Sequence, residues 1–131
     1  MGGREVKLVD TSSWIEYLRG HENDVARRVK ELVRMDQAGW CDLIAVELWN
    51  GVRPGSEKKA LDELEEAATS FALSSDVWRK ARRLAFRCRE SGVTVPANDV
   101  VIAACAVSYD LEMEHYDGHF EKILPIAAKL A

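Results

Sequence analysis

The segment 5–10, EVKLVD, constrains the fold more than any other, because it is a short apolar strand pattern that leads directly into a helix. Hydroxyl side chains at 11–13 are suited to capping a helix N-terminus, and Glu16 follows Ser13 at capping-box spacing. The pattern therefore predicts a strand over 5–10 followed by a helix over about 12–19.

Short strands and longer helices alternate along the rest of the chain. Further strand patterns occupy 71–73 and 111–116, whereas residues 37–39 are interpreted as a break after a helix. Strands separated by helices are typical of an α/β fold with a largely parallel sheet, in which functional groups gather at the carboxyl ends of the strands. Apolar residues at helical spacing predict the remaining helices over about 22–35, 43–52, 56–68, 75–90 and 99–109, with a short helical turn at 119–123.

The length and composition are those of one globular domain, which we assign to residues 1–131. With 47% hydrophobic and 31% charged residues, the chain can bury a core without disulfides. No segment is long and apolar enough to cross a bilayer and no signal-peptide pattern opens the chain, so we expect a cytoplasmic protein without membrane attachment. The three cysteines are far apart and are expected to be reduced thiols.

The net charge of −4 argues against a protein that coats nucleic acid nonspecifically, but it allows an enzyme with an acidic site and basic residues elsewhere. Basic residues gather in the segments 27–34 and 79–89. The segment 79–89 either binds RNA phosphates or forms a solvated helix face, and we favour the solvated face.

Four acidic residues stand at positions that favour a functional site: Asp10, Glu47, Asp99 and Asp117. Asp10 ends the first strand, and Asp117 follows the last strand pattern. Glu47 lies within the apolar segment IAVELW, where an unpaired buried charge is costly. Asp99 opens the most apolar helix. All four are therefore expected to converge on one rim of the sheet.

Each acid taken singly also has an ordinary structural interpretation. Asp10 could cap the helix that follows it, and Asp99 could interact with a helix dipole. Asp117 precedes a glycine and could simply form a turn. For Glu47 a solvated helix face fits poorly. It is the combination of the four that favours a site.

A cluster of like charges without an internal cation calls for a divalent metal. Ligation by oxygen alone indicates Mg²⁺ or Mn²⁺ and not zinc. Such an ion lowers the pKa of a bound water and stabilises the transition state of an in-line phosphoryl displacement, so the predicted chemistry is phosphodiester hydrolysis.

Four segments of the chain together form a recognisable pattern: VDTSSWIEYL at 9–18, AVELWNGVR at 45–53, PANDVVIAACA at 96–106 and HYDGHFEKI at 115–123. They resemble the PIN-domain ribonucleases of the VapC group, and their order and separations match that family. The resemblance spans nearly the whole chain and implies a three-layer α/β/α PIN-like fold with a short, largely parallel sheet. It places Asp10, Glu47, Asp99 and Asp117 at the family's four acidic positions.

The resemblance further implies an Mg²⁺- or Mn²⁺-dependent endoribonuclease, the toxin of a toxin–antitoxin pair, which cuts tRNA or ribosomal RNA with a metal-activated water. Asp10 and Asp99 are the expected principal ligands, Glu47 holds metal or orients the attacking water, and Asp117 supports a second ion or an outer-shell water. The expected partners are RNA, a VapB-type antitoxin that lays a peptide over the active-site groove, and a second copy of the chain in a homodimer.

His119 departs from the family pattern, which commonly reads D-x-D-F where this chain reads DGHF. The loss of one carboxylate is expected to weaken a second metal site. His115 and His119 have the i, i+4 spacing that suits zinc on a helix, but Asp117 and Gly118 are expected to break any helix there, so zinc is disfavoured.

Several other residues have two interpretations. Thr11 and Asn98 either orient the carboxylates, as the resemblance implies, or cap helices. Residues 14, 17 and 18 (Trp, Tyr and Leu) either line an antitoxin groove or pack in the core. The segment 123–131 is short for the family's last strand, which leaves that strand in doubt.

Three other functions stay open at this point. The protein could be a solitary PIN nuclease outside a toxin–antitoxin pair. It could be a non-catalytic PIN-like scaffold that binds RNA or protein, which the four acids argue against and His119 allows. An aspartyl phosphotransferase is disfavoured, because its D-x-D motif requires an acid at Ser12.

Overall fold

The computed structural model describes residues 5–130, which form a four-stranded parallel sheet flanked by seven helices. The sheet has the order β3-β2-β1-β4, and Leu8 in its centre pairs with Gly39 on one side and Met113 on the other. This confirms the predicted α/β fold. The strands are β1 (Lys7–Val9), β2 (Ala38–Cys41), β3 (Thr69–Phe71) and β4 (Met113–Glu114).

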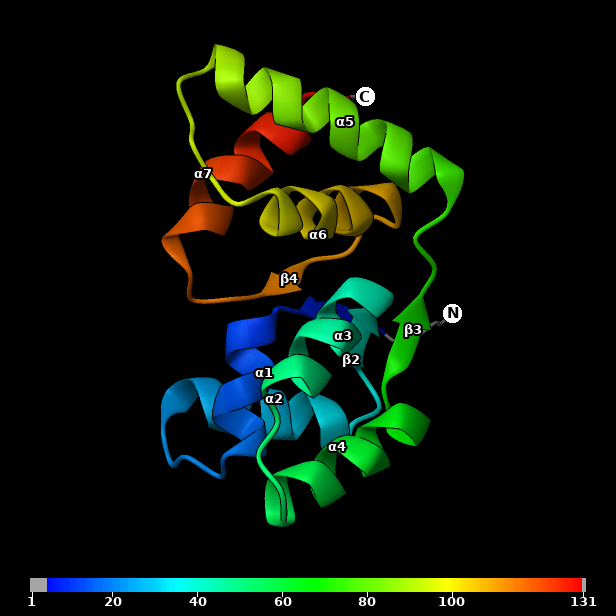
Figure 1. The fold of residues 1–131 in the computed structure, drawn as a ribbon, viewed down its shortest axis with the longest axis vertical. Coiled ribbons are helices and arrows are strands. Elements are labelled where there is room, and N and C mark those ends of the chain that lie inside the picture. The colour runs from blue at the N-terminus through cyan, green and yellow to red at the C-terminus, as the bar shows by residue number, and fades with distance from the viewer. Residues whose placement is uncertain (1–4, 131) are drawn as a thin grey trace.

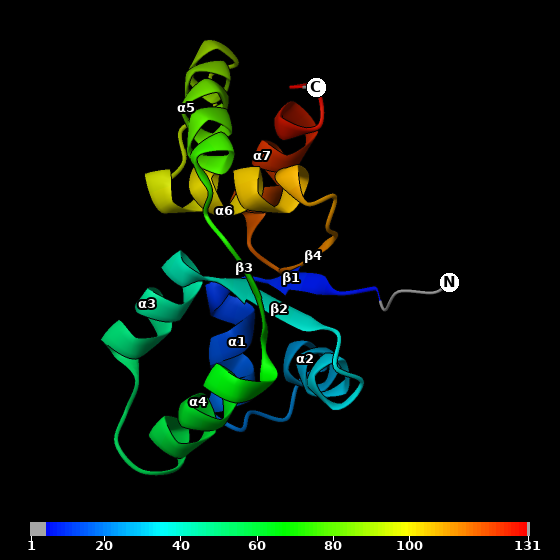
Figure 2. The same ribbon diagram turned by 90° about the vertical axis from the view of Figure 1, so that its right-hand side faces the viewer.

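The helices form two layers, one on each face of the sheet (Figures 1 and 2). On one face lie α1 (Thr11–Leu18), α2 (Asp24–Arg34) and α4 (Ser56–Ala67). On the opposite face α6 (Ala97–Ser108) lies nearest the sheet, and α5 (Ser75–Glu90) and α7 (Gly118–Ala127) pack against it. The helix α3 (Asp42–Gly51) leaves the carboxyl end of β2 and contacts both α1 and α6.

The apolar patterns of the sequence explain which helices are central. In α6 five consecutive residues, 102–106, are buried, because this helix packs against the sheet, α3, α5 and α7. In α5 one stripe is buried and the rest of its surface is solvated; the stripe consists of Val77, Ala81, Leu84 and Cys88. None of the helices in the described part of the chain is both long and apolar enough to cross a membrane.

The order of the strands fixes where a site can form. From β1 the chain moves to β2 on one side, and it later returns to β4 on the other side. A crevice opens at such a switch point, outside the carboxyl ends of the strands. Asp10 follows β1 directly and Asp117 follows β4, so the sheet brings both to the same edge, at this switch point.

The strand β2 was missed by sequence reasoning, which interpreted residues 37–39 as a break. All four residues of β2 are buried, and the strand pairs with both β1 and β3. Its sequence, AGWC, contains no β-branched residue, so its conformation depends on neighbouring strands that local propensity cannot report.

The C-terminal region also differs from the prediction. The expected short turn at 119–123 is a ten-residue helix, α7, and the described residues contain no strand after it. The predicted strand 111–116 shrinks to Met113–Glu114, and the strand expected at 71–73 lies at Thr69–Phe71. The cysteines are free and buried, as expected.

Gly39 lies where two strands approach so closely that a side chain has little room. A Cβ at this position would lie 2.7 Å from Cε2 of Phe71 and 3.2 Å from the carbonyl oxygen of Thr69. We expect Gly39→Ala to lower the free energy of unfolding by about 1–2 kcal/mol, as overpacked core substitutions do.

Gly51 provides the control, because it lies in α3 with nothing within 4 Å of its added Cβ. Gly51→Ala is expected to be neutral or to stabilise by about 0.5 kcal/mol. Urea denaturation compares the two variants, and equal stabilities would show that the β2–β3 contact does not exclude a side chain.

Candidate active site

Asp10 is a buried carboxylate at the carboxyl end of β1. Its residue is only 2% exposed, and Oδ1 accepts a hydrogen bond of 2.8 Å from the backbone N–H of Ser13, so it caps α1. Burial raises the pKa of this carboxyl, while the hydrogen bonding with Ser13 acts in the opposite direction. Capping therefore explains the hydrogen bond of Asp10, but an N-cap does not need to be buried to this degree.

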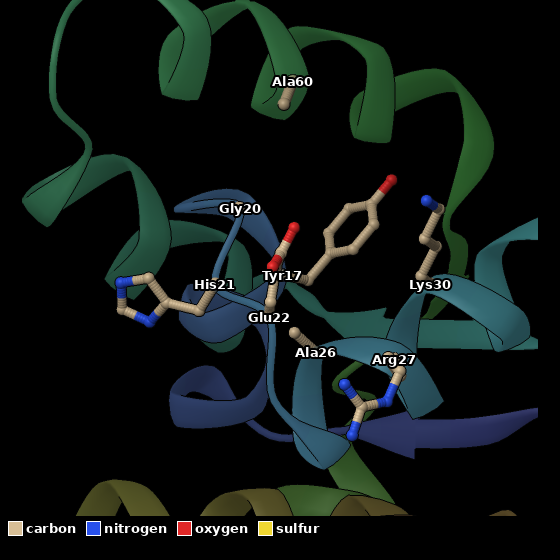
Figure 3. A pocket seen from close by; sticks show the side chains of 8 residues that line it. All are labelled: Tyr17, Gly20, His21, Glu22, Ala26, Arg27, Lys30 and Ala60. Carbon is tan, nitrogen blue, oxygen red and sulfur yellow. The ribbon is translucent and has the colours of Figure 1, made fainter.

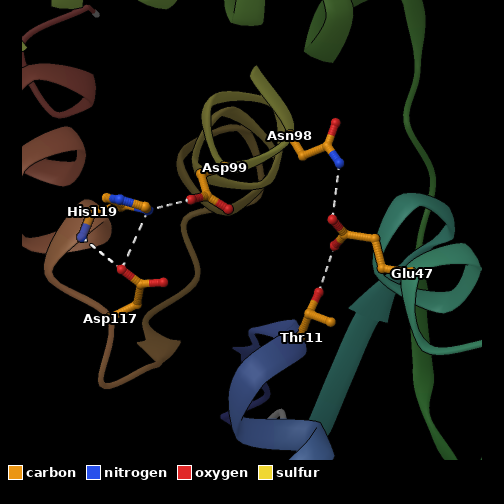
Figure 4. A network of polar contacts seen from close by, with 6 residues as sticks. All are labelled: Thr11, Glu47, Asn98, Asp99, Asp117 and His119. Carbon is orange, nitrogen blue, oxygen red and sulfur yellow. Dashed lines mark hydrogen bonds and ion pairs between the residues drawn. The ribbon is translucent and has the colours of Figure 1, made fainter. Parts of the chain in front are cut away.

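Asp99 and Asp117 approach each other from two different helices, with His119 between them (Figure 4). Asp99 lies in the first turn of α6, and Asp117 is the N-cap of α7. The Nδ1 atom of His119 lies 2.8 Å from Oδ2 of Asp99 and 3.4 Å from Oδ1 of Asp117. The break expected at Asp117–Gly118 is therefore the start of a helix, and His115 lies outside it.

Glu47 extends from α3 across the opening between α1 and α6 (Figure 4). Its Oε1 accepts a 2.5 Å hydrogen bond from Thr11, and its Oε2 accepts one of 2.9 Å from Asn98. Glu47 is partly buried, but it is not enclosed by apolar residues as the sequence predicts, since neighbouring Val46 is 63% exposed. The buried residues of α3 are Ile44 and Leu48, which lie on either side of Glu47 in the sequence.

The four predicted acids are close enough for their charges to affect one another. Burial is the largest cause of the raised pKa of Asp99, and the charges of Asp117 and Glu47 raise it further. The charge of Asp117 also raises the pKa of Asp10. Within residues 5–130 no lysine or arginine forms an ion pair with any of these four carboxylates. Their mutual repulsion is therefore relieved only in part, by His119 beside Asp99 and by His115 near Asp10.

The donor atoms fit a divalent cation at one point of this cluster. One carboxylate oxygen each from Asp99 and Asp117 and a ring nitrogen of His119 lie within 4.8 Å of one another. Asp10 and Glu47 lie outside this group of three. The structure thus brings two of the four acids close enough to share an ion and leaves the other two outside this group.

Glu114 is a further buried acid of this region that sequence reasoning missed. It ends β4, is 7% exposed, and its backbone carbonyl accepts a hydrogen bond of 3.1 Å from the N–H of Asp10. Its Oε2 lies 2.9 Å from Nε of Arg28, which reaches it from α2. The alternating pattern LEMEHY hinted at an inward face, but it could not identify the arginine 86 positions away.

His115 does not join His119 in a metal site. Its ring packs against Phe120 with centroids 5.5 Å apart, and it is absent from the group of possible ligands found among the described residues. The structure therefore does not bring the two histidines together as ligands of one ion among the described residues.

A groove of about 590 Å³ lies away from the acids, between α1, α2 and α4 (Figure 3). Tyr17 lines this groove, and burial raises the pKa of its phenol. Trp14 and Leu18 belong to the core instead, with 0% and 8% exposure. Of the three residues considered for an antitoxin groove, only Tyr17 faces open space.

The Arg-rich helix α5 presents its cations to solvent, on the layer above α6. Arg79 pairs with Asp76 at 2.7 Å, and Nε of Arg87 lies 3.9 Å from Glu90. Both pairs are exposed and so contribute little to stability. This exposure is compatible with a solvated face and with phosphate binding.

The fold and the site define an α/β protein whose acidic cluster lies at the switch point of a parallel sheet. The sequence pattern of the PIN domain matches residues 7–123. The chain belongs to the PIN domain family.

Two curated relatives are ribonucleases by name. The VapC ribonuclease Mb1587 of Mycobacterium bovis is 30% identical over 123 residues, which cover 91% of this chain and 92% of that protein. Ribonuclease VapC19 of Mycobacterium tuberculosis is 33% identical over 109 residues, which cover 82% of this chain and 86% of that protein.

A solved structure shares the fold at low sequence identity. The crystal structure of VapBC2 from Rickettsia felis, bound to a DNA fragment from their promoter, matches with a TM-score of 0.73 and 12% identity. The match covers 92% of this chain and 94% of that chain. It supports the three-layer arrangement of helices around a parallel sheet.

Proposed function

We propose that this protein is a metal-dependent endoribonuclease and the toxin of a VapC-type toxin–antitoxin pair, with Asp10, Glu47, Asp99 and Asp117 as its site residues. One observation carries the proposal: Asp99 and Asp117 approach a common point beside buried Asp10, without lysine or arginine partners among the described residues. Membership of the PIN domain family and the VapC ribonucleases among the relatives support the RNA substrate.

The aspartates are proposed to bind the cation, and Glu47 is proposed to orient the attacking water. A bound Mg²⁺ or Mn²⁺ supplies a water of lowered pKa and neutralises charge on the phosphate. Asp99 and Asp117 would hold the cation, and Asp10 would contribute its buried charge from the end of β1. Glu47 is held by Thr11 and Asn98 from two other helices, so its carboxylate has a fixed position from which to accept a hydrogen bond from the attacking water.

The remaining expectations rest on the relatives. We propose that residues 1–131 form a single PIN domain that works in the cytoplasm as a homodimer, each subunit paired with a VapB-type antitoxin. A peptide with an arginine or lysine suits the acidic site, because a cation there relieves the repulsion between the carboxylates. The groove beside Tyr17 offers an apolar wall for the same partner.

RNA cleavage by the purified protein is expected to require a divalent cation. With Mg²⁺ or Mn²⁺ the protein should cut RNA, and EDTA should stop cleavage completely because the carboxylates alone cannot activate water at neutral pH. Labelled RNA resolved on a denaturing gel measures the product, and readdition of Mn²⁺ in excess of EDTA controls for irreversible damage.

The outcomes separate the alternatives. Undiminished cleavage in EDTA would contradict the metal mechanism. A folded protein that binds RNA but does not cut it with either cation would favour the non-catalytic scaffold. An antitoxin reading frame immediately upstream would support the toxin assignment, whereas its absence would favour a solitary nuclease.

A further inference from the structure

We propose that His119 is itself a metal ligand, which adds an imidazole nitrogen to the carboxylates of Asp99 and Asp117. This mixed set of donors shifts the preference of the site away from Mg²⁺ and toward later transition metals such as Ni²⁺ and Zn²⁺. The inference rests on the proposed metal-dependent function but goes beyond it, since it assigns a ligand and an ion preference.

The distances around His119 match those between neighbouring ligands of one ion. Nδ1 lies 2.8 Å from Oδ2 of Asp99 and 3.4 Å from Oδ1 of Asp117. Two adjacent ligands of an octahedral ion with bonds of about 2.1 Å are separated by about 3.0 Å. Two ligands of tetrahedral zinc, with bonds of about 2.0–2.1 Å, are separated by about 3.3–3.4 Å. Both observed separations fall close to these values.

The protein already holds the ring in this position. The backbone N–H of His119 donates to Oδ1 of Asp117 at 2.8 Å, which ties the start of α7 to the site. The next residue, Phe120, is 1% exposed and anchors the same turn in the core. Figure 4 shows the imidazole directed toward Asp99, and its side chain remains 42% exposed. A ligand positioned before the ion arrives loses little freedom on binding.

The chemical consequence concerns the choice of ion. Carboxylate oxygens suit Mg²⁺ and Mn²⁺, whereas imidazole suits transition metals such as Ni²⁺ and Zn²⁺. Replacement of a third carboxylate by His119 also removes one negative charge from a site in which carboxylates already repel one another. The substitution that sequence analysis interpreted as the loss of a ligand is thus the exchange of one ligand for another.

A rival interpretation gives His119 a purely orienting role. In that case its ring N–H donates to Asp99, and an ion binds to oxygen atoms alone. The two interpretations differ in whether a histidine nitrogen is bonded directly to the ion, which pulsed electron paramagnetic resonance of bound Mn²⁺ detects.

The decisive experiment loads the intact protein with Mn²⁺ and records nitrogen hyperfine coupling. We expect a directly bonded histidine nitrogen, whose coupling changes when the wild-type protein contains ¹⁵N-labelled histidine. His119→Asp should lose this coupling while still binding Mn²⁺, because an aspartate in the first turn of α7 supplies oxygen and suits the helix dipole. His21→Gln is the matched control, since His21 is exposed and pairs with Glu16.

Calorimetric titration with Ni²⁺ and with Mg²⁺ gives a second readout that does not depend on cleavage. The ratio of Ni²⁺ to Mg²⁺ affinity is expected to fall about tenfold or more in His119→Asp, and to stay unchanged in His21→Gln. The labelled wild-type protein reports whether a histidine nitrogen is bonded to the ion, and loss of the coupling in His119→Asp, with Mn²⁺ binding retained, assigns that nitrogen to His119.

The outcomes distinguish this inference from the function on which it rests. Binding of Mn²⁺ that Asp99→Asn weakens, without any histidine coupling, would overturn the role of His119 and leave the nuclease proposal standing. Absence of Mn²⁺ binding that depends on Asp99 would overturn both.

Discussion

Asp10→Asn is expected to abolish RNA cleavage and at the same time to raise the stability of the metal-free protein. A carboxylate that supports a bound cation contributes several kcal/mol to the transition state, and a loss of about 4 kcal/mol lowers the rate about a thousandfold. Asparagine is also a good N-cap, so the hydrogen bond from the N–H of Ser13 is retained. Loss of activity is therefore not the result of a damaged α1.

The gain in stability follows from the direction of the pKa shift. Burial raises the pKa of Asp10 above its ordinary value of 3.8, so the folded state holds its proton more tightly than the unfolded state. Below the ordinary value both states are protonated and the burial of a charge costs nothing. As pH rises through the raised pKa, the folded state must bury an ionised carboxylate and loses stability. Asparagine avoids this loss.

Thermal unfolding in EDTA, measured from pH 3 to pH 8, tests this expectation. The midpoint of Asp10→Asn should exceed that of the wild type near neutral pH, and the difference should shrink as pH falls. Asp62→Asn is the control, because Asp62 lies exposed on α4 beside Lys58 and should change neither cleavage nor the pH profile. A stable but fully active Asp10→Asn variant would remove Asp10 from the site.

Arg28→Met is expected to destabilise the fold by about 2–3 kcal/mol, which lies between the values for exposed and fully buried ion pairs. Arg28 is the cation that pairs with Glu114, and the Glu114 side chain is only 8% exposed whereas that of Arg28 is 50% exposed. Removal of the guanidinium leaves a carboxylate buried without its partner, while methionine preserves much of the packing of the arginine stem.

Arg27→Met is the matched control on the same helix. Arg27 pairs with Asp24, and both side chains are exposed, so its loss should change stability by less than about 0.5 kcal/mol. Addition of Glu114→Gln to Arg28→Met should recover part of the lost stability, because it removes the unpaired charge. Chemical denaturation measures all four proteins, and equal midpoints for Arg28→Met and Arg27→Met would contradict a structural role for the pair.

Much of the architecture could be predicted because it is encoded in local patterns. The stripe of α5 and the apolar α6 were predicted from helical spacing, and both helices occur close to the predicted positions. The position of Asp10 at the end of a strand and that of Asp99 at the start of α6 likewise follow from neighbouring residues. Prediction failed for β2, whose AGWC sequence is a strand only because β1 and β3 lie on either side of it.

The residues of the candidate site were predicted less well than the fold. Glu47 was selected for the wrong reason, since the apolar residues next to it in sequence are not those around its carboxylate, which contacts Thr11 and Asn98. Glu114 was not selected at all, because its partner Arg28 is distant in the chain. Periodicity identifies which face of a helix or strand is buried, but it does not identify the distant residues that contact this face.

The sequence by itself determined the class of fold and the acids that are available, because strand and helix periods and the apolar surroundings of a charge are local properties. The tertiary structure decided which of these groups meet. The placement of β4 beside β1 brings Asp117 and His119 to Asp99. The packing of α1, α3 and α6 against one another allows Thr11 and Asn98 to donate hydrogen bonds to Glu47. Such encounters depend on packing between segments far apart in the chain, which no local pattern contains.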